Sequence, residues 1–204
     1  MIKQALSDFI VHINCDREVE LYNEAGLQHE MALFLRKALG KDFTIRLEYP
    51  IGKVGIKEKL VKKEMDIYLS RKDKPSEQYC IELKLPYGRS IPRRMFQVHE
   101  DVFFLEQLKS KGFKKGFIFF TTPAKTFWRE DLGPAKLYHA FTHRGLKIET
   151  LFNEDVPPFL RKTQSVDPIF QYRKSYKAVW QDFKLGHLNS KGNAEDWKCW
   201  LLEV

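Results

Sequence analysis

Apolar residues recur at helical spacing in two stretches of the chain. Between residues 19 and 39 they fall three or four positions apart, and Gly40 follows as a residue typical of helix C-termini. Between residues 90 and 109 the same spacing returns, with Ser90 as the expected N-cap and Pro92 in the first turn. The pattern therefore predicts two amphipathic helices.

Strand-like segments separate and follow these helices. Three of them lie between the two helices, and a continuous apolar run, typical of a strand buried on both faces, follows the second. A shorter helix is predicted over residues 131–142, with one more strand after it. The predicted strands cover residues 43–51, 64–70, 77–85, 115–122 and 146–152.

The order of these elements predicts an α/β fold. A helix, three strands, a helix, a strand, a helix and a strand indicate a mixed central β-sheet flanked by helices. We expect residues 1–155 to form this core, with residues 51–63, which contain five lysines, as a basic loop or ribbon. Residues 156–204 are less regular and hold three of the four tryptophans. We expect them to be a helical or looped C-terminal extension packed on the core.

Two charged residues stand among apolar neighbours in the third predicted strand. Because residues two apart in a strand share a face, Glu82 and Lys84 point together, away from Ile81 and Leu83. If the second and third strands form a hairpin with their apolar faces on one side, Asp66 joins Glu82 and Lys84. The sequence thus predicts a cluster of two carboxylates and one ammonium group.

Such a cluster has a chemical use. Two adjacent carboxylates repel each other unless a cation joins them, and Mg²⁺ prefers oxygen ligands. A metal ion held in this way polarises a phosphoryl oxygen and lowers the pKa of a bound water, while a nearby lysine orients or deprotonates that water or stabilises developing charge. The set suits hydrolysis of phosphodiester bonds. The alternative is a solvated strand face with an ordinary Glu-x-Lys pair.

These residues resemble the motifs of the PD-(D/E)xK nuclease superfamily, which includes restriction endonucleases. Asp66 stands at the family's first acidic position, on the second strand, with Met65 in place of the proline. Residues 82–84 match its acid-x-Lys motif on the third strand. The resemblance covers residues 19–152 and implies a restriction-endonuclease-like core with the order α-β-β-β-α-β.

The resemblance also implies a cofactor and a role for each motif residue. Mg²⁺, for which Mn²⁺ can substitute, would be held by Asp66, Glu82 and the backbone carbonyl of Leu83. Lys84 would serve the attacking water. Asp66, Glu82 and Lys84 are therefore the principal catalytic candidates.

The resemblance also implies a functional residue on each of the two predicted helices. Many family members add an acid on the first helix, where this chain offers Glu24 and Glu30. We prefer Glu30 as the third carboxylate, in catalysis and in metal binding, because a helical wheel places it at the edge of the apolar face. Some members place a glutamine on the helix after the third strand, and Gln97 fits that position, where it would touch the scissile phosphate or a base. The alternative at each position is an ordinary helix-surface side chain.

The charge of the chain favours an anionic partner. The net charge is +8, and nucleic acid is the commonest partner of basic proteins. Several basic residues flank the acidic motif in the sequence, and two of them open the second predicted helix, whose N-terminus itself favours phosphate. The expected nucleic-acid contacts are Lys62, Lys63, Arg89, Arg93 and Arg94. The alternative is a charged face that only serves solubility.

The cysteines and the apolar runs bear on the cellular setting. Cys15, Cys80 and Cys199 are far apart and odd in number, which disfavours a disulfide framework and a zinc site. Because the chain shows no signal-peptide pattern and no long apolar run, we expect a cytoplasmic protein without membrane contact.

The sequence as a whole predicts a Mg²⁺-dependent nuclease, expected to be an endonuclease, that cleaves DNA by attack of a metal-activated water. A homodimer is compatible with this function, because cleavage of both strands needs two sites. Two alternatives stay open. One is a nucleic-acid-binding module that keeps the fold and does not cleave, and the other is a nuclease directed at RNA.

Overall fold

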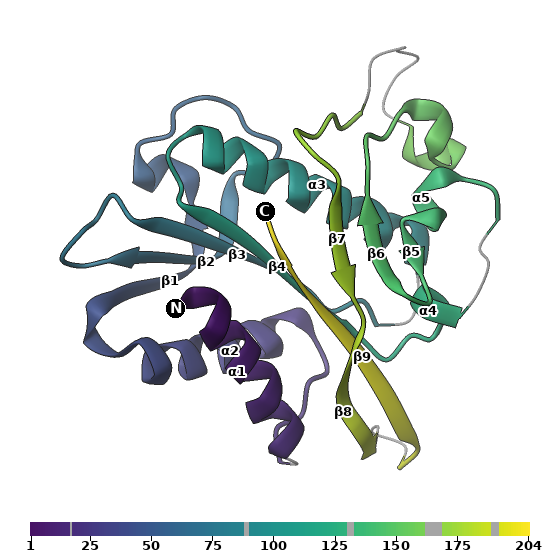
Figure 1. Ribbon diagram of the computed structural model, residues 1–204, viewed down its shortest axis with the longest axis horizontal. Coiled ribbons are helices and arrows are strands. Elements are labelled where there is room, and N and C mark those ends of the chain that lie inside the picture. The colour runs from purple at the N-terminus through teal and green to yellow at the C-terminus, as the bar shows by residue number, and fades with distance from the viewer. Residues whose placement is uncertain (17, 88–89, 130–132, 162–168, 189–191) are drawn as a thin grey trace.

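The computed structural model has a mixed α/β architecture (Figure 1). A six-stranded sheet runs through the molecule, and a three-stranded sheet lies beside it. The α/β class predicted from the element order is therefore confirmed. The structure describes residues 1–16, 18–87, 90–129, 133–161, 169–188 and 192–204.

The central sheet has the strand order β1-β2-β3-β4-β9-β8. Its neighbouring strands are antiparallel, except that β3 and β4 are parallel. A parallel pair needs a crossover connection, and α3 (Ile91–Ser110) supplies it. The strands are β1 (Phe43–Pro50), β2 (Glu64–Arg71), β3 (Gln78–Lys84), β4 (Lys115–Thr122), β8 (Gln181–Leu188) and β9 (Ala194–Glu203).

Helices cover both faces of this sheet. α1 (Ile2–Cys15) and α2 (Glu24–Leu39) lie on one face, and α3 lies on the other (Figure 1). Neighbouring residues of β3 belong to two separate hydrophobic clusters. Ile81 packs on the side of α1 and α2, whereas Cys80 packs on the side of α3. β3 is thus buried on both faces, so a charged side chain in it needs a partner inside the protein.

The three-stranded sheet packs on the α3 side and has the order β5-β6-β7. Gly145, in β6, has φ 140°, and a Cβ at this position would collide with the carbonyl oxygen of Ala178 on β7, so the pairing requires glycine. The remaining elements are α4 (Thr126–Arg129), α5 (Lys136–His139), β5 (Phe141–Thr142), β6 (Gly145–Ile148), β7 (Tyr176–Val179) and the 3₁₀ turns η1 (Gly40–Asp42), η2 (Ile51–Val54), η3 (Asn153–Asp155) and η4 (Pro158–Leu160).

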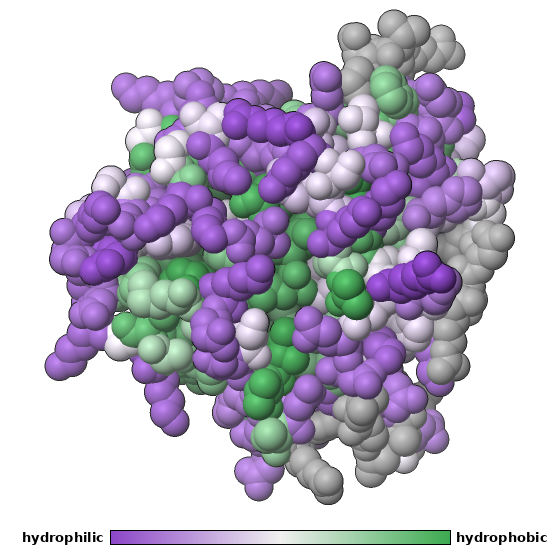
Figure 2. Space-filling model, viewed as in Figure 1, coloured by the Kyte–Doolittle hydropathy of each residue, from purple (hydrophilic) through white to green (hydrophobic). Residues whose placement is uncertain are grey.

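The surface is mainly polar on the face shown in Figure 2, where hydrophilic residues surround smaller hydrophobic areas toward the middle. Most large apolar side chains are instead gathered in the two clusters on either side of the central sheet. Within the described residues, no helix combines the length and the apolar character needed to cross a membrane.

The two predicted helices are confirmed, with differences at their starts. α2 begins at Glu24 rather than at residue 19, because the Asn23 side chain accepts a hydrogen bond from the Gly26 amide and caps the helix. α3 follows Ser90 as predicted, but Ser90 has φ 68° and its side chain forms no capping bond with a described residue. α1 lies outside the elements that the pattern predicts.

The predicted strands β1 to β4 agree with the structure to within one residue at each end. The later elements agree less well. The helix predicted over residues 131–142 is replaced by α5 and β5, and residues 130–132 lie outside the described residues. The strand predicted over 146–152 ends at Ile148.

The C-terminal part of the chain belongs to the central sheet. β9 pairs with β4 from Lys198 to Glu203, and β8 pairs with β9. The Trp200 side chain is fully buried and stacks on Phe120 of β4, with ring centroids 4.8 Å apart. The prediction of a helical or looped extension over residues 156–204 was therefore wrong, because two of its strands complete the sheet.

His99 on α3 makes stability sensitive to acid. Burial, with a smaller contribution from the Lys136 charge, lowers the pKa of His99 from 6.5 to about 3, and Nδ1 of the ring lies 2.9 Å from the Tyr172 hydroxyl. Because the pKa is lower in the folded state, the unfolded chain takes up the proton first as pH falls. Stability present above pH 6.5 is therefore lost between about pH 6.5 and pH 3.

We expect His99→Asn to remove part of this acid sensitivity. Between pH 7 and pH 5 the wild type should lose about 2 kcal/mol of unfolding free energy through His99 alone, and the variant should lose correspondingly less. Urea unfolding at the two pH values measures the difference. The exposed His29→Asn is the control, and an equal loss in all three proteins would contradict the assignment.

Candidate functional site

The hydrogen-bond ladder between β2 and β3 ends next to the predicted acidic residues. Its last paired residues are Ile67 and Ile81. Beyond them, the Leu83 amide donates to Asp66 Oδ2 over 2.7 Å, and the Asp66 amide donates to Glu82 Oε1 over 3.4 Å. Side-chain carboxylates thus replace the backbone acceptors of the ladder, and both acids are fixed at its end.

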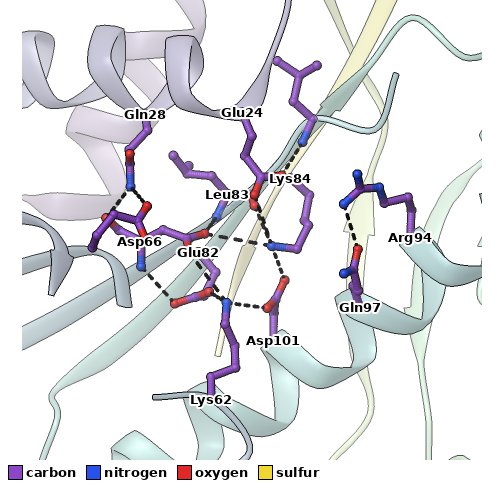
Figure 3. A network of polar contacts seen from close by, with 12 residues as sticks. Glu24, Gln28, Lys62, Asp66, Glu82, Leu83, Lys84, Arg94, Gln97 and Asp101 are labelled. Carbon is purple, nitrogen blue, oxygen red and sulfur yellow. Dashed lines mark hydrogen bonds and ion pairs between the residues drawn. The ribbon is translucent and has the colours of Figure 1, made fainter. Parts of the chain in front are cut away.

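Glu82 is fully buried, and its charge is met by a lysine from outside β3. Lys62, from the loop before β2, forms an ion pair with Glu82 Oε2 (Figure 3). The same ammonium lies 2.9 Å from Asp101 Oδ1 and 3.8 Å from Asp66 Oδ1. One cation therefore contacts three carboxylates, which come from β2, β3 and α3.

Lys84 lies two residues after Glu82 on the same face of β3, and its side chain enters the same cluster. Its Nζ donates to the Leu83 carbonyl over 2.7 Å and lies 3.0 Å from Asp101 Oδ2 (Figure 3). It is also 3.9 Å from Asp66 Oδ2 and 3.9 Å from Glu24 Oε1. Asp101 thus lies between the two lysines and holds both ammonium groups.

α2 closes the other side of the cluster. The Gln28 side chain donates to the backbone carbonyl of Asp66 over 2.7 Å and to Glu48 Oε1 over 2.6 Å. One turn earlier, Glu24 Oε2 accepts from the Leu85 amide over 3.2 Å. Residues four apart share a helix face. One face of α2 therefore contacts both the start of β2 and the end of β3.

A pocket of about 240 Å³ opens beside Asp66 on the α2 side. Glu48 borders it with φ 46°, a left-handed conformation that is strained for a residue with a side chain and that clusters at functional sites. The pocket gives solvent and small ligands access to the acidic cluster. Its lining consists of Glu24, Ala25, Gln28, Glu48, Asp66 and Leu83.

Burial and mutual repulsion set the protonation of the site. Burial, and then the nearby Asp66 charge, raise the pKa of Glu82 to about 8, although Lys62 opposes the shift. Burial alone would lower the pKa of Lys62, but the charges of Asp101, Glu82 and Asp66 outweigh it and raise that pKa well above its ordinary range. The pKa of Lys84 is likewise raised, chiefly by Asp101 against burial. Both lysines therefore stay charged.

The donor atoms have the chemistry that Mg²⁺ requires. The carboxylates of Asp66 and Glu82 and the carbonyl of Leu83 are hard oxygen ligands. When all four acids of the cluster are ionised, Glu24 and Asp101 included, they exceed its two ammonium groups by two charges, which matches one divalent cation. In the described residues, however, no three His, Cys, Asp or Glu side chains are grouped so that they could hold a metal ion. The oxygen ligands suit Mg²⁺, but each of them already accepts a hydrogen bond from a donor of the protein: the Leu83 amide on Asp66, Lys62 on Glu82 and Lys84 on the Leu83 carbonyl.

Two of the residues chosen from the sequence lie apart from this cluster. Glu30 is six residues from Glu24, which turns it about 120° away around α2, and its charge acts on Lys184 of β8 instead. The structure thus brings Glu24 rather than Glu30 to the acidic cluster, so the preference between these two acids is corrected. Gln97 accepts a hydrogen bond from Arg94 over 3.0 Å (Figure 3).

The basic residues expected to contact nucleic acid divide into two groups. Lys63, Arg93 and Arg94 are exposed, the two arginines in the first turn of α3. Lys62 instead directs its ammonium into the acidic cluster. Arg89 lies outside the described residues.

Asp101 and Gln28 are site residues that the sequence reasoning missed. Asp101 carried a signal, because it stands between Val98 and Val102 on the apolar side of α3, where an acid needs a buried partner. Gln28 lies four residues after Glu24, and its role follows only from the packing of α2 against the strand ends.

No protein-family model, curated protein or solved structure matches the chain. The function of the cluster is therefore inferred from its own contacts and chemistry.

A double-mutant cycle tests whether Asp101 and Lys84 form one unit. Removal of one partner of a buried ion pair costs about 3–5 kcal/mol, so Lys84→Met and Asp101→Asn should each destabilise the protein by about that amount. The double variant should lose at least about 1 kcal/mol less than the two single losses combined. Urea unfolding measures all four proteins, and additive losses would show that the two residues act independently.

Proposed function

We propose that the protein is a Mg²⁺-dependent nuclease of the restriction-endonuclease-like, PD-(D/E)xK type, which hydrolyses phosphodiester bonds in DNA. The observation that carries this proposal is the meeting of Asp66, Glu82 and Lys84 where the β2–β3 ladder ends. The arrangement of α2, β1, β2, β3, α3 and β4 in this order along the chain supports the same fold type.

Asp66, Glu82 and the carbonyl of Leu83 would hold the metal ion. When bound, Mg²⁺ supplies polarisation of a phosphoryl oxygen and a lowered pKa for the attacking water. Asp66 is already oriented by the Leu83 amide, so its carboxylate needs no rearrangement to act as a ligand. Glu24, at the open side of the pocket, is suited to accept a hydrogen bond from the attacking water.

Lys84 acts as a permanent cation in this proposal. Because Asp101 keeps it protonated, Lys84 does not take the proton of the attacking water. It donates hydrogen bonds and stabilises negative charge that develops on the phosphate. Of the roles open to this lysine from the sequence, the contacts favour electrostatic stabilisation.

In this proposal the DNA backbone would bind across the exposed basic residues of α3 and of the loop before β2. Arg93 and Arg94 stand at the N-terminus of α3, where the helix dipole and free backbone amides also favour phosphate. Lys63, in the loop before β2, is a third exposed basic residue that we assign to this contact. Salt-dependent binding follows from such contacts.

A non-cleaving nucleic-acid-binding module is the second candidate. The ion pairs of Lys62 favour it, because an ammonium group already contacts the carboxylates of Glu82, Asp101 and Asp66. A protein that needed no metal ion could keep this arrangement unchanged.

A nuclease assay separates these functions. With Mg²⁺ or Mn²⁺ the wild type should nick or linearise supercoiled plasmid, and Asp66→Asn and Lys84→Met should each lower the rate by at least about a hundredfold, as expected for groups that act on the transition state. Glu64→Gln, an exposed change on the same strand as Asp66, is the matched control. Linear duplex, single-stranded DNA and RNA are tested alongside.

The outcomes of this assay are distinct. Binding of DNA without cleavage by the wild type would sink the nuclease proposal and favour the binding module. Cleavage confined to RNA would redirect the substrate. Equal rates in the wild type and in Asp66→Asn would show that the cleaving activity does not belong to this site.

Salt dependence tests the phosphate contacts at α3. In an Asp66→Asn background, which should bind without cutting, Arg93→Gln should weaken duplex binding and reduce the slope of log affinity against log salt by about 1. Fluorescence anisotropy at several salt concentrations gives the slope. Lys37→Gln, an exposed change at the far end of α2, should leave it unchanged, and an unchanged slope in Arg93→Gln would remove that residue from the interface.

A further inference from the structure

Lys62 places a positive charge where three carboxylates converge. Its ammonium pairs with the fully buried Glu82 and lies within 4 Å of both Asp101 and Asp66. We infer that Lys62 is an internal counter-ion that holds the acidic cluster together and that a divalent cation binds by displacing it. This inference rests on the proposed function, because the displaced position is the one that the metal ion would need.

The contacts explain why the two cations exclude each other. Lys62 occupies Glu82 Oε2 and approaches Asp66 Oδ1, and these two side chains are the carboxylate ligands proposed for the metal ion. A hydrated or partly dehydrated Mg²⁺ needs these oxygens for itself, and its charge repels the ammonium at the same position. Binding of either cation therefore weakens binding of the other.

Lys62 can leave, whereas Lys84 is held. The Lys62 side chain is 26% exposed and belongs to a loop, while the Lys84 side chain is 8% exposed and lies on the central strand β3. The loop backbone is anchored on both sides of Lys62. The Val61 amide donates to Gln107 on α3, and the Ile51 amide donates to the Lys63 carbonyl. Displacement thus needs rotation of a long side chain and no movement of the chain.

The Lys62 side chain also contacts an aromatic ring, and this contact does not depend only on its charge. Its ammonium lies over the Phe104 ring of α3, 5.7 Å from the centroid. Methionine at position 62 keeps an unbranched stem against this ring and removes the charge, so Lys62→Met isolates the counter-ion role.

Mn²⁺ binding and stability without metal together test the inference. Free Mn²⁺ measured by electron paramagnetic resonance should show that Lys62→Met binds Mn²⁺ at least tenfold more tightly than the wild type. In EDTA, the variant should melt at a lower temperature, because its buried acids have lost their counter-ion, and added Mn²⁺ should raise its melting temperature more than it raises that of the wild type. Lys62→Arg keeps the charge and should gain less than threefold in affinity.

Two further measurements keep the result interpretable. Lys59→Met, at an exposed position of the same loop, should leave Mn²⁺ affinity unchanged. If Lys62→Met does not fold, ¹⁵N-lysine spectra of the wild type replace it, because the Lys62 ammonium, held by its ion pairs, should give a signal in EDTA that shifts or is lost on addition of Mg²⁺. A Lys62 signal indifferent to Mg²⁺ would overturn the inference.

The outcomes distinguish this inference from the nuclease proposal. If Lys62→Met binds Mn²⁺ no more tightly than the wild type while both cleave DNA, Lys62 is a fixed structural partner and only the inference fails. If Lys62→Met binds Mn²⁺ more tightly and neither protein cleaves any nucleic acid, the inference stands and the nuclease proposal fails. Absence of Mn²⁺ binding in both proteins overturns both.

Discussion

A fully buried carboxylate, that of Glu82, is the constraint on which the rest of the site depends. A buried charge costs several kcal/mol unless it is paired and hydrogen-bonded. Lys62 supplies the ion pair, the Asp66 amide donates to the second oxygen, and the Cys80 thiol lies 3.3 Å from that same oxygen. Lys62 in turn needs Asp101 to balance its own burial. One acid on β3 therefore links the loop before β2, the start of β2 and, through Lys62, the middle of α3.

The layered architecture brings these partners together because β3 is buried on both faces. α3 must cross from the end of β3 to the start of β4, and this crossover carries Asp101 over the strand that holds Glu82. On the other side, Gln28 of α2 binds the backbone of Asp66 where the ladder with β3 ends. The acids thus lie at the junction of two helices and two strands, where rigid elements fix their geometry.

Strand alternation, a local property, was enough to put Glu82 and Lys84 on one face, and Asp66 joined them once the second and third strands were paired as a hairpin. This reasoning could not choose between Glu24 and Glu30, since both lie near the edge of one helical stripe and the choice depends on how α2 rotates against the sheet. The strand β9 was missed because its buried residues do not keep one period of two: Trp197 and Cys199 pack in one hydrophobic cluster, whereas Trp200 and Leu202 pack in the other. The role of Lys62 depends on a loop that spans from β1 to β2, and no local pattern encodes it.

The energetic argument for a function starts from the cost of this cluster. Replacement of buried ion pairs by packed apolar residues is often neutral or stabilising. Stability alone therefore does not explain why four acids and two lysines meet between α2, α3 and the ends of the strands. Burial, and then the nearby negative charge of Asp66, raise the pKa of Glu82, and the excess of carboxylates favours the entry of a further cation. Lys62 reduces that excess without removing it. In the exchange that we propose, the cluster folds around its own lysine and keeps an electrostatic driving force to replace that lysine with a divalent ion.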